Sequence, residues 1–269
     1  MKYKLTYFTT MSSKIREPYC AGSWYSNNPK SLASEIDSYL GNVKTEEKRN
    51  VKAMIVPHAG YIYSGQVAAY SFRQIGSEIK TVIILGTAHR YPLRGVCIMD
   101  YEYYDSPLGK VKVSGKIKDF LKEKDVVSIV EADYGEHSIE IEIPFLQRAM
   151  KEFEIIPVIV GQVNHTEFSK LLEEYSDNST LIVASVDLSH FHDYETAKDL
   201  DNYSIDTILK LNAKGIDDAE IDSPYAIKSL IDLALRKEWK TKLLNYKNSG
   251  DTAGDKRRVV GYASIIFYN

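Results

Sequence analysis

The chain has 269 residues, of which 44% are hydrophobic and 26% are charged, values typical of a globular protein. Its formal net charge of −3 lacks the basic excess of nucleic-acid-binding proteins, so we expect no nucleic-acid partner. No run of about 18 apolar residues occurs, which argues against a transmembrane helix and against a membrane partner.

The cysteine content and the first residues bear on the compartment. Only Cys20 and Cys97 are present and no CxxC spacing occurs, so we expect neither a disulfide scaffold nor a thiolate zinc site. Residues 1–15 lack the apolar block of a signal peptide, and we interpret them as a leader or arm ahead of the folded chain. These features favour a cytoplasmic protein.

Short apolar runs alternate with amphipathic stretches along the chain, which is the pattern of an α/β fold. The apolar runs predict strands at 51–57, 81–86, 95–100, 154–160, 180–186 and 259–268. The amphipathic stretches predict helices at 30–41, 64–76, 114–124, 138–152, 165–176, 195–213 and 224–237. Several of the runs are apolar almost throughout, as expected of central strands that are covered on both faces.

No repeat, low-complexity tract or long linker divides the chain. Residues 247–258, KNSGDTAGDKRR, are polar and contain glycine, so we expect a flexible loop before the last strand. The sequence therefore predicts one α/β domain over residues 1–269, with a mostly parallel central sheet flanked by helices.

Histidines follow three of the predicted strands. His58 comes directly after strand 51–57, His89 follows strand 81–86, and strand 180–186 leads into Asp187 and His190. Because binding sites of open α/β sheets lie beyond the carboxyl ends of the strands, we expect these side chains to meet at one edge of the sheet. A single histidine at such a place is better explained as a loop or packing residue, but three together favour a shared site.

Two neutral imidazoles and a carboxylate with open positions suit non-haem Fe(II), and the same atoms accept copper or zinc. No HExxH or other compact metal-binding motif is present, so this prediction depends on the constellation of strand ends alone. The absence of a GxSxG segment argues against a serine hydrolase.

Three further segments are rich in functional residue types. The glycines of PHAGYIYSG at 57–65 permit close approach to a ligand, although an ordinary strand–turn–helix connection explains them equally well. Asp133 and Glu136 are explained by the preference for acidic residues in the first turn of a helix, whereas His137 is not. Trp24 offers an aromatic pocket wall, with core packing as the alternative.

Several segments together resemble the Memo family, which comprises the eukaryotic cell-motility mediator and its archaeal and bacterial relatives. The matching segments are 16–25 (REPYCAGSWY), 57–65 (PHAGYIYSG), 85–89 (LGTAH), 136–140 (EHSIE), 185–190 (SVDLSH) and 261–263 (GYA). They occur in order over nearly the whole chain, and their combination is highly specific.

The resemblance implies a fold similar to the catalytic subunit of class III extradiol dioxygenases. It also implies a redox-active metal, Fe(II) or copper, bound by His58, His89 and a third ligand that is commonly a cysteine in the family. This chain has Asp222 near the aligned position, which would complete a set of two histidines and one carboxylate. The alternatives are that Asp222 caps the helix at 224–237 and that Asp187 is the ligand in its place.

The resemblance extends to residues around the metal. His190 matches the position of an acid–base histidine in the dioxygenases, and Asp187 would orient it. Trp24, Tyr61 and His137 would line the pocket.

The first hypothesis for function is therefore a metal-dependent oxidoreductase that acts on a small molecule. The alternative is a non-catalytic binding or signalling protein that takes phosphotyrosine-type peptides, with Arg90 and Arg94 as cationic donors. A third hypothesis is an accessory to a radical-enzyme system, which would be a separate protein because this chain has no CxxxCxxC motif. The sequence predicts no oligomeric state and does not decide whether the protein is an enzyme.

Overall fold

A computed structural model describes residues 14–44 and 49–269. No helix within these ranges is long and apolar enough to cross a membrane. Of the predicted arm 1–15, residues 1–13 lie outside the described residues, and Ile15 already pairs with Tyr103 in the sheet.

The described strands form one mixed sheet, with the order β1-β5-β6-β8-β3-β9-β2-β12-β10. In addition β11 pairs with β12, and β4 pairs with β7 and β8. The strands are β1 (Ile15–Arg16), β2 (Val51–Val56), β3 (Thr81–Thr87), β4 (Val96–Cys97), β5 (Tyr103–Tyr104), β6 (Val111–Val113), β7 (Val126–Val127), β8 (Glu154–Val160), β9 (Thr180–Ser185), β10 (His190–His192), β11 (Lys240–Asn248) and β12 (Val259–Tyr268).

The centre of the sheet is parallel. Strands β6, β8, β3, β9 and β2 run in one direction, and β12 joins β2 in the antiparallel direction. Strands β3 and β9 are buried along their whole length, because helices cover both faces. The prediction of a single α/β domain with a mostly parallel central sheet is confirmed.

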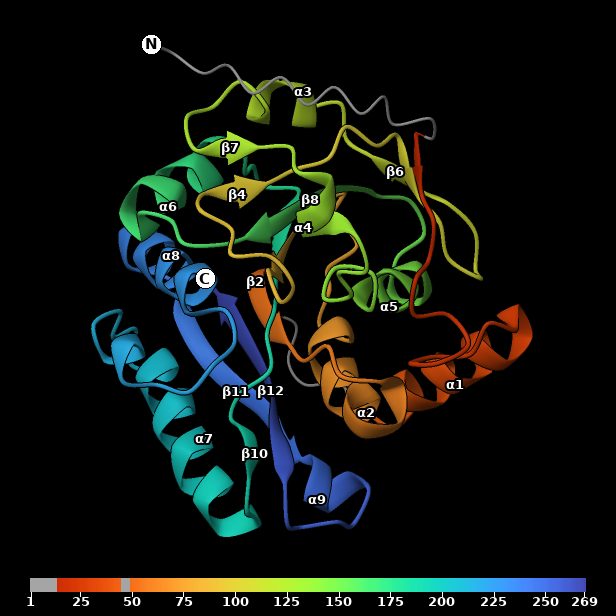
Figure 1. The fold of residues 1–269 in the computed structure, drawn as a ribbon, viewed down its shortest axis with the longest axis vertical. Coiled ribbons are helices and arrows are strands. Elements are labelled where there is room, and N and C mark those ends of the chain that lie inside the picture. The colour runs from red at the N-terminus through yellow and green to blue at the C-terminus, as the bar shows by residue number, and fades with distance from the viewer. Residues whose placement is uncertain (1–13, 45–48) are drawn as a thin grey trace.

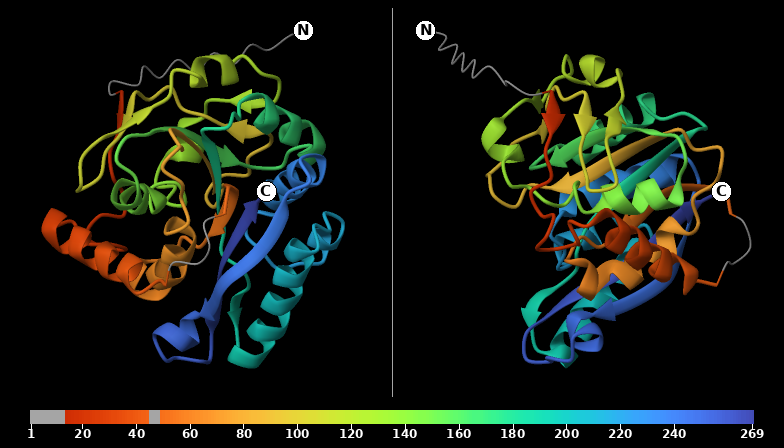
Figure 2. Two further views of the ribbon diagram at one scale, coloured as in Figure 1. Left: turned by 180° about the vertical axis from the view of Figure 1, so that it is seen from behind. Right: turned by 90° about the vertical axis from the view of Figure 1, so that its right-hand side faces the viewer.

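Helices lie on both sides of this sheet. Figures 1 and 2 show α1, α2 and α5 on one side and α6, α7 and α8 on the other. The helices are α1 (Pro29–Gly41), α2 (Tyr61–Phe72), α3 (Ile117–Phe120), α4 (Val130–Asp133), α5 (Glu142–Ala149), α6 (His165–Glu174), α7 (Tyr194–Leu209), η1 (Gly215–Asp217), α8 (Pro224–Arg236) and α9 (Ser249–Thr252).

Local sequence explains where several helices begin. The side chain of Asn28 accepts hydrogen bonds from the backbone of Lys30 and Ser31, with Pro29 in the first turn of α1. Asn164 caps α6 and Asp193 caps α7 in the same way. These side chains satisfy amide groups that have no partner within the helix.

Several sequence expectations differ from the structure. The helix expected at 114–124 is reduced to Ile117–Phe120, and the one expected at 64–76 is Tyr61–Phe72. The stretch 247–258 is not a loop throughout, because β11 extends to Asn248 and α9 follows it. The helix expected at 138–152 begins only at Glu142, and residues 138–141 form turns. The strand expected at 95–100 is reduced to Val96–Cys97.

Candidate metal centre

Three neighbouring strands end at the same edge of the sheet. Strands β3, β9 and β2 are consecutive in the sheet and parallel, so their carboxyl ends lie side by side. His58 follows β2, His89 follows β3, and Asp187 follows β9. The expectation that these residues meet at one edge of the sheet therefore agrees with the topology.

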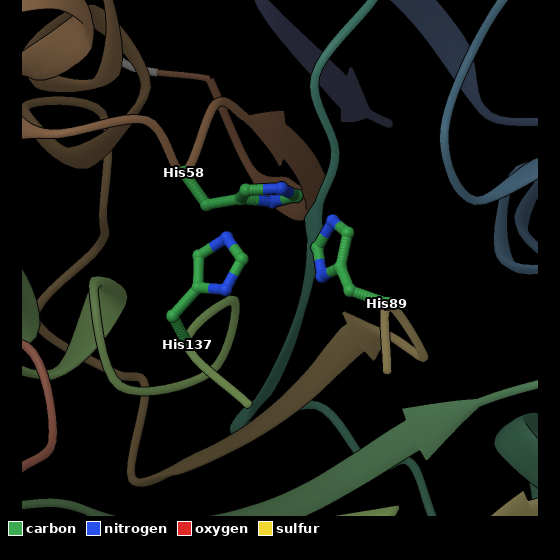
Figure 3. A group of neighbouring side chains, drawn as sticks. All are labelled: His58, His89 and His137. Atoms are coloured by element: carbon green, nitrogen blue, oxygen red, sulfur yellow. The ribbon is translucent and has the colours of Figure 1, made fainter. Parts of the chain in front are cut away.

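His58, His89 and His137 form a cluster that could hold a metal ion. One nitrogen from each ring lies within 4.8 Å of the other two. The ring of His137 is 5.2 Å from that of His58 and 4.5 Å from that of His89, measured between centroids. Figure 3 shows the three imidazoles gathered around one space, each reaching it from a different segment. His137 comes from the turn before α5 rather than from a strand end.

Asp222 lies against two rings of this cluster. Its Oδ2 atom is 3.0 Å from Nε2 of His58 and 3.5 Å from Nε2 of His89. Helix α8 begins with Ser223 as its N-cap and no side-chain cap is formed, so Asp222 does not cap this helix. Its carboxylate faces the histidines instead.

Asp187 has a different environment. Its Oδ1 atom accepts a hydrogen bond of 2.9 Å from the backbone N–H of His58. The contact ties the end of β9 to the end of β2 and fixes the backbone that carries His58. Of the two aspartates, Asp222 is therefore the one whose carboxylate makes short contacts with ring nitrogens of the cluster.

The Nδ1 atoms of His58 and His89, on the side of each ring away from Asp222, also have hydrogen-bond partners. Nδ1 of His89 lies 3.0 Å from Oε1 of Glu136, which is an acceptor when ionised. Nδ1 of His58 lies 3.1 Å from Oγ of Ser185. When Nδ1 is protonated and donates to such a partner, the neutral ring has its lone pair on Nε2. Both Nε2 atoms are thereby directed at the space beside Asp222.

The carboxylates determine which groups carry charge. Burial opposes protonation of His58, but Asp187 and Asp222 outweigh it and raise the pKa of His58 to about 10. Burial is likewise outweighed at His89, where hydrogen bonds to Asp222 and Glu136 raise the pKa to about 9. Burial raises and the charged His58 lowers the pKa of the Asp222 carboxyl, and the lowering dominates. Without a metal, the two rings are cations paired with Asp222.

The ring of His137, unlike those of His58 and His89, stays neutral at neutral pH. Burial and the positive charges of His58 and His89 lower its pKa to about 3. Its ring also packs on Trp24, with the centroids 4.3 Å apart. A ring that stays neutral can offer a nitrogen lone pair to a metal without first losing a proton.

A cavity of about 390 Å³ opens beside the cluster. The three histidines, Asp187 and His190 are polar groups in its lining. The apolar part of the lining includes Trp24, Ile62, Tyr63, Phe191 and Val260. At the mouth, Ile62 is 72% exposed and Phe191 is 59% exposed. A pocket of this size with apolar walls and a few converging polar groups is typical of small-molecule sites.

Two residues expected at the site lie elsewhere. Tyr61 is buried in the core, where its hydroxyl donates to the backbone oxygen of Ile141 and its ring packs on Phe145. It is the first residue of α2 and its ring lies against Tyr25 and Phe145, whereas Ile62 and Tyr63 line the cavity. Arg90 is exposed beside the ring of Tyr19 and is not part of the cavity lining.

Sequence reasoning missed the role of Glu136. Its carboxylate accepts hydrogen bonds from the backbone of His89, His137 and Ser138 in addition to the ring of His89. The sequence suggests an acidic residue in the first turn of a helix, but α5 begins only at Glu142. The adjacency of Glu136 and His137 in the sequence is the one available signal.

The fold and the site define an α/β protein with a histidine-rich candidate metal centre at the carboxyl edge of its sheet. A family model described as Memo-like protein matches residues 16–266. The chain is 33% identical to a MEMO1 family protein of Sulfurisphaera tokodaii, over 94% of this chain and 99% of that protein. It is 31% identical to a MEMO1 family protein of Aquifex aeolicus, with the same coverage. The chain belongs to the Memo family.

A solved structure supports the fold. The crystal structure of an uncharacterized protein from Escherichia coli K12 superposes with a TM-score of 0.51 and covers 80% of this chain and 99% of that chain. The two sequences are 14% identical, so the likeness concerns the fold alone.

Proposed function

We propose that this protein binds a redox-active metal ion, Fe(II) or copper, through Nε2 of His58, Nε2 of His89 and the carboxylate of Asp222. The observation that carries the proposal is the position of Asp222 Oδ2, which lies within 3.5 Å of both Nε2 atoms. Two imidazoles and one carboxylate with open positions are the donor set that non-haem iron enzymes use. His137, neutral and part of the same cluster, is available as a further ligand.

The two histidines are also oriented for metal binding. Each strand-end histidine is anchored through Nδ1, by Ser185 in one case and by Glu136 in the other, so neither ring has to be reoriented to present Nε2. The two histidines follow the ends of β2 and β3, and Asp222 lies just before helix α8, so each ligand is close to a regular element that can hold its position. A metal bound there would supply Lewis acidity and one-electron chemistry.

The cavity residues support a role in catalysis on a small apolar substrate. Trp24, Tyr63 and Phe191 would hold an aromatic or aliphatic group and exclude water from it. His190 lines the same cavity and would take a proton from a substrate hydroxyl as general base. Asp187, in the same lining, would stabilise the imidazolium that forms. The reaction class we propose is therefore metal-dependent oxidation.

The two alternative functions lack such support in the cavity. No arginine or lysine is among the described residues that line it, and Arg90 lies outside. Phosphotyrosine-peptide binding and service to a radical-enzyme system stay predictions.

Metal content tests the proposal. The protein is purified anaerobically, and its iron and copper are measured by elemental analysis beside a His58→Ala/His89→Ala variant. We expect about one equivalent in the parent and none in the variant, as for a site whose ligands all come from the folded chain. A matched control is His165→Ala, because His165 pairs with Asp232 between α6 and α8, away from the cavity. Stoichiometric metal in the double variant would contradict the proposal.

A further inference from the structure

Glu142, the first residue of α5, is fully buried and incompletely hydrogen-bonded. Its Oε1 atom lies 2.8 Å from Oγ of Ser185. Its Oε2 atom has no hydrogen-bond partner among the described residues. An ionised carboxylate in the interior needs several donors, and a carboxylate with one oxygen unpartnered is costly to desolvate. The environment of Glu142 therefore suits a neutral carboxylic acid better than an anion.

The hydroxyl of Ser185 gives an independent count of protons. Its Oγ atom is 2.6 Å from the backbone oxygen of Ser138, 2.8 Å from Oε1 of Glu142 and 3.1 Å from Nδ1 of His58. A serine hydroxyl has one hydrogen to donate and two lone pairs that accept. The carbonyl of Ser138 can only accept, so the single hydrogen is directed there.

The remaining two partners must then donate to Ser185. His58 donates its Nδ1–H, and Glu142 donates the O–H of a protonated carboxyl group. An ionised Glu142 could only accept, and Ser185 would face two acceptors with one hydrogen. Only the neutral acid satisfies all three contacts.

The charges around Glu142 agree with this count. Burial raises the pKa of its carboxyl group to about 8, Ser185 and the charged His58 act in the lowering direction, and Asp187 acts in the raising direction. Glu136 is the contrasting case, since the hydrogen bonds and charge of His89 outweigh burial and lower its pKa to about 2.

We propose that Glu142 is a positioning residue that acts as a neutral proton donor. Through Ser185 it fixes the hydrogen of His58 on Nδ1 and so presents the lone pair of Nε2 to the metal site. The inference rests on the proposed function, because it assigns Glu142 and Ser185 to the support of a metal ligand. His58 is thereby supported by a neutral pair and His89 by the anion of Glu136.

Infrared spectroscopy of the metal-free protein tests the protonation state directly. At neutral pH the parent should show the C=O stretching band of a protonated carboxylic acid, and part of that band should disappear in Glu142→Gln. Glu140→Gln is the matched control, since Glu140 is buried but accepts from two backbone amides and from the hydroxyl of Tyr25. A parent-minus-Glu142→Gln difference spectrum without this band would overturn the proposal, whatever the metal content.

Metal affinity tests the positioning role. Glutamine keeps a neutral side chain with an N–H that donates to Ser185, so Glu142→Gln should bind Fe(II) within about twofold of the parent. Glu142→Leu and Ser185→Ala should weaken binding about 10- to 100-fold, the range for outer partners of metal ligands. Ser71→Ala, a buried serine paired with Ser264 instead, should leave binding unchanged.

The outcomes separate this inference from the proposed function. Equal weakening by Glu142→Gln and Glu142→Leu would mean that the negative charge is needed, and it would overturn the neutral-donor role. Retention of metal by His58→Ala/His89→Ala would contradict the proposed metal site. The infrared result would still decide whether the carboxyl group of Glu142 is protonated. Should Glu142→Leu fail to fold, the infrared spectrum and the Fe(II) affinity of Glu142→Gln still test the proposal.

Discussion

Nδ1 of His89 lies 3.0 Å from Oε1 and 3.2 Å from Oε2 of Glu136. The same carboxylate accepts the backbone N–H groups of His89 and His137, so one buried anion holds two members of the histidine cluster. Because Glu136 is ionised, it can only accept, and His89 must carry its hydrogen on Nδ1. Glu136 therefore fixes both the position and the tautomer of His89.

The first prediction concerns metal affinity in Glu136→Gln. The amide cannot accept as many hydrogen bonds as the carboxylate, and His89 loses its anionic partner. We expect Fe(II) binding to weaken about 10- to 100-fold, measured by competition with a chelator. Glu131→Gln is the control, because Glu131 is an exposed acid on the preceding helix α4. Equal affinity in Glu136→Gln and the parent would show that His89 needs no such partner.

The second prediction concerns acid stability of the metal-free protein. The pKa of Glu136 is lowered from 4.5 to about 2, so the folded state favours its anion. The resulting stabilisation, about 3 kcal/mol, is present above pH 4.5 and is lost as the pH falls toward 2. Urea unfolding across this range should show a weaker pH dependence in Glu136→Gln than in the parent. Parallel curves for the two proteins would refute this assignment, and Glu131→Gln should follow the parent.

The third prediction is the pH dependence of metal binding. In the metal-free protein, His58 and His89 keep their protons to about pH 10 and about pH 9, and each proton must leave before Nε2 can bind. Affinity should therefore rise with pH, by about 100-fold per unit while two protons are displaced. His137, with a pKa of about 3, contributes no proton at neutral pH.

Calorimetry in buffers of different ionisation enthalpy measures this proton release. Release of two protons per metal at neutral pH is the expected result. An affinity that levels off above about pH 6.5 would instead indicate histidines that titrate like unperturbed side chains.

The fourth prediction separates the two candidate carboxylate ligands. Asp222→Ala removes the group that contacts both Nε2 atoms and should weaken metal binding at least about 100-fold. Asp187→Asn keeps the Oδ1 acceptor for the His58 backbone and should bind metal within a few-fold of the parent. Loss of metal in Asp187→Asn with retention in Asp222→Ala would reverse the assignment.

The central strands and the polar residues at their carboxyl ends can be predicted from the sequence. Strands β2, β3, β8, β9 and β12 are long, apolar runs, and such runs are typical of buried strands in a parallel sheet. His58, His89 and Asp187 can be placed at one edge because the strand ends are fixed once the strands are known. Asp222 is identified only through the resemblance to a family.

Other features depend on tertiary contacts that no local pattern encodes. Strand β11 (KTKLLNYKN) is half-buried and polar, and it is defined by its pairing with β12 rather than by an apolar run. In the sequence Glu142 resembles any residue inside a helix, and only the packing of α5 against the end of β9 brings it to Ser185. The comparison of the fold with extradiol dioxygenases stays a prediction.

The last prediction tests how closely residues 136–139, the turn that carries Glu136 and His137, are packed on strand β3. A Cβ atom at Gly86 would lie 2.6 Å from Cγ1 of Ile139 and 2.7 Å from Oγ of Ser138. Ser138 Oγ accepts from the backbone of Thr87 and donates to Glu136, so the displaced turn is the one that carries Glu136 and His137. Gly86→Ala should therefore lower stability by about 1–3 kcal/mol and also weaken metal binding.

The matched control is Gly115→Ala, where an added Cβ meets nothing within 4 Å. Thermal unfolding and Fe(II) titration of both variants measure the two effects. If Gly86→Ala loses stability but binds metal like the parent, the turn at 136–139 yields without moving the ligands, and the packing of Ser138 and Ile139 on β3 is then not needed for metal binding. If both properties fall together, the turn and the strand end act as one rigid support for the histidine cluster.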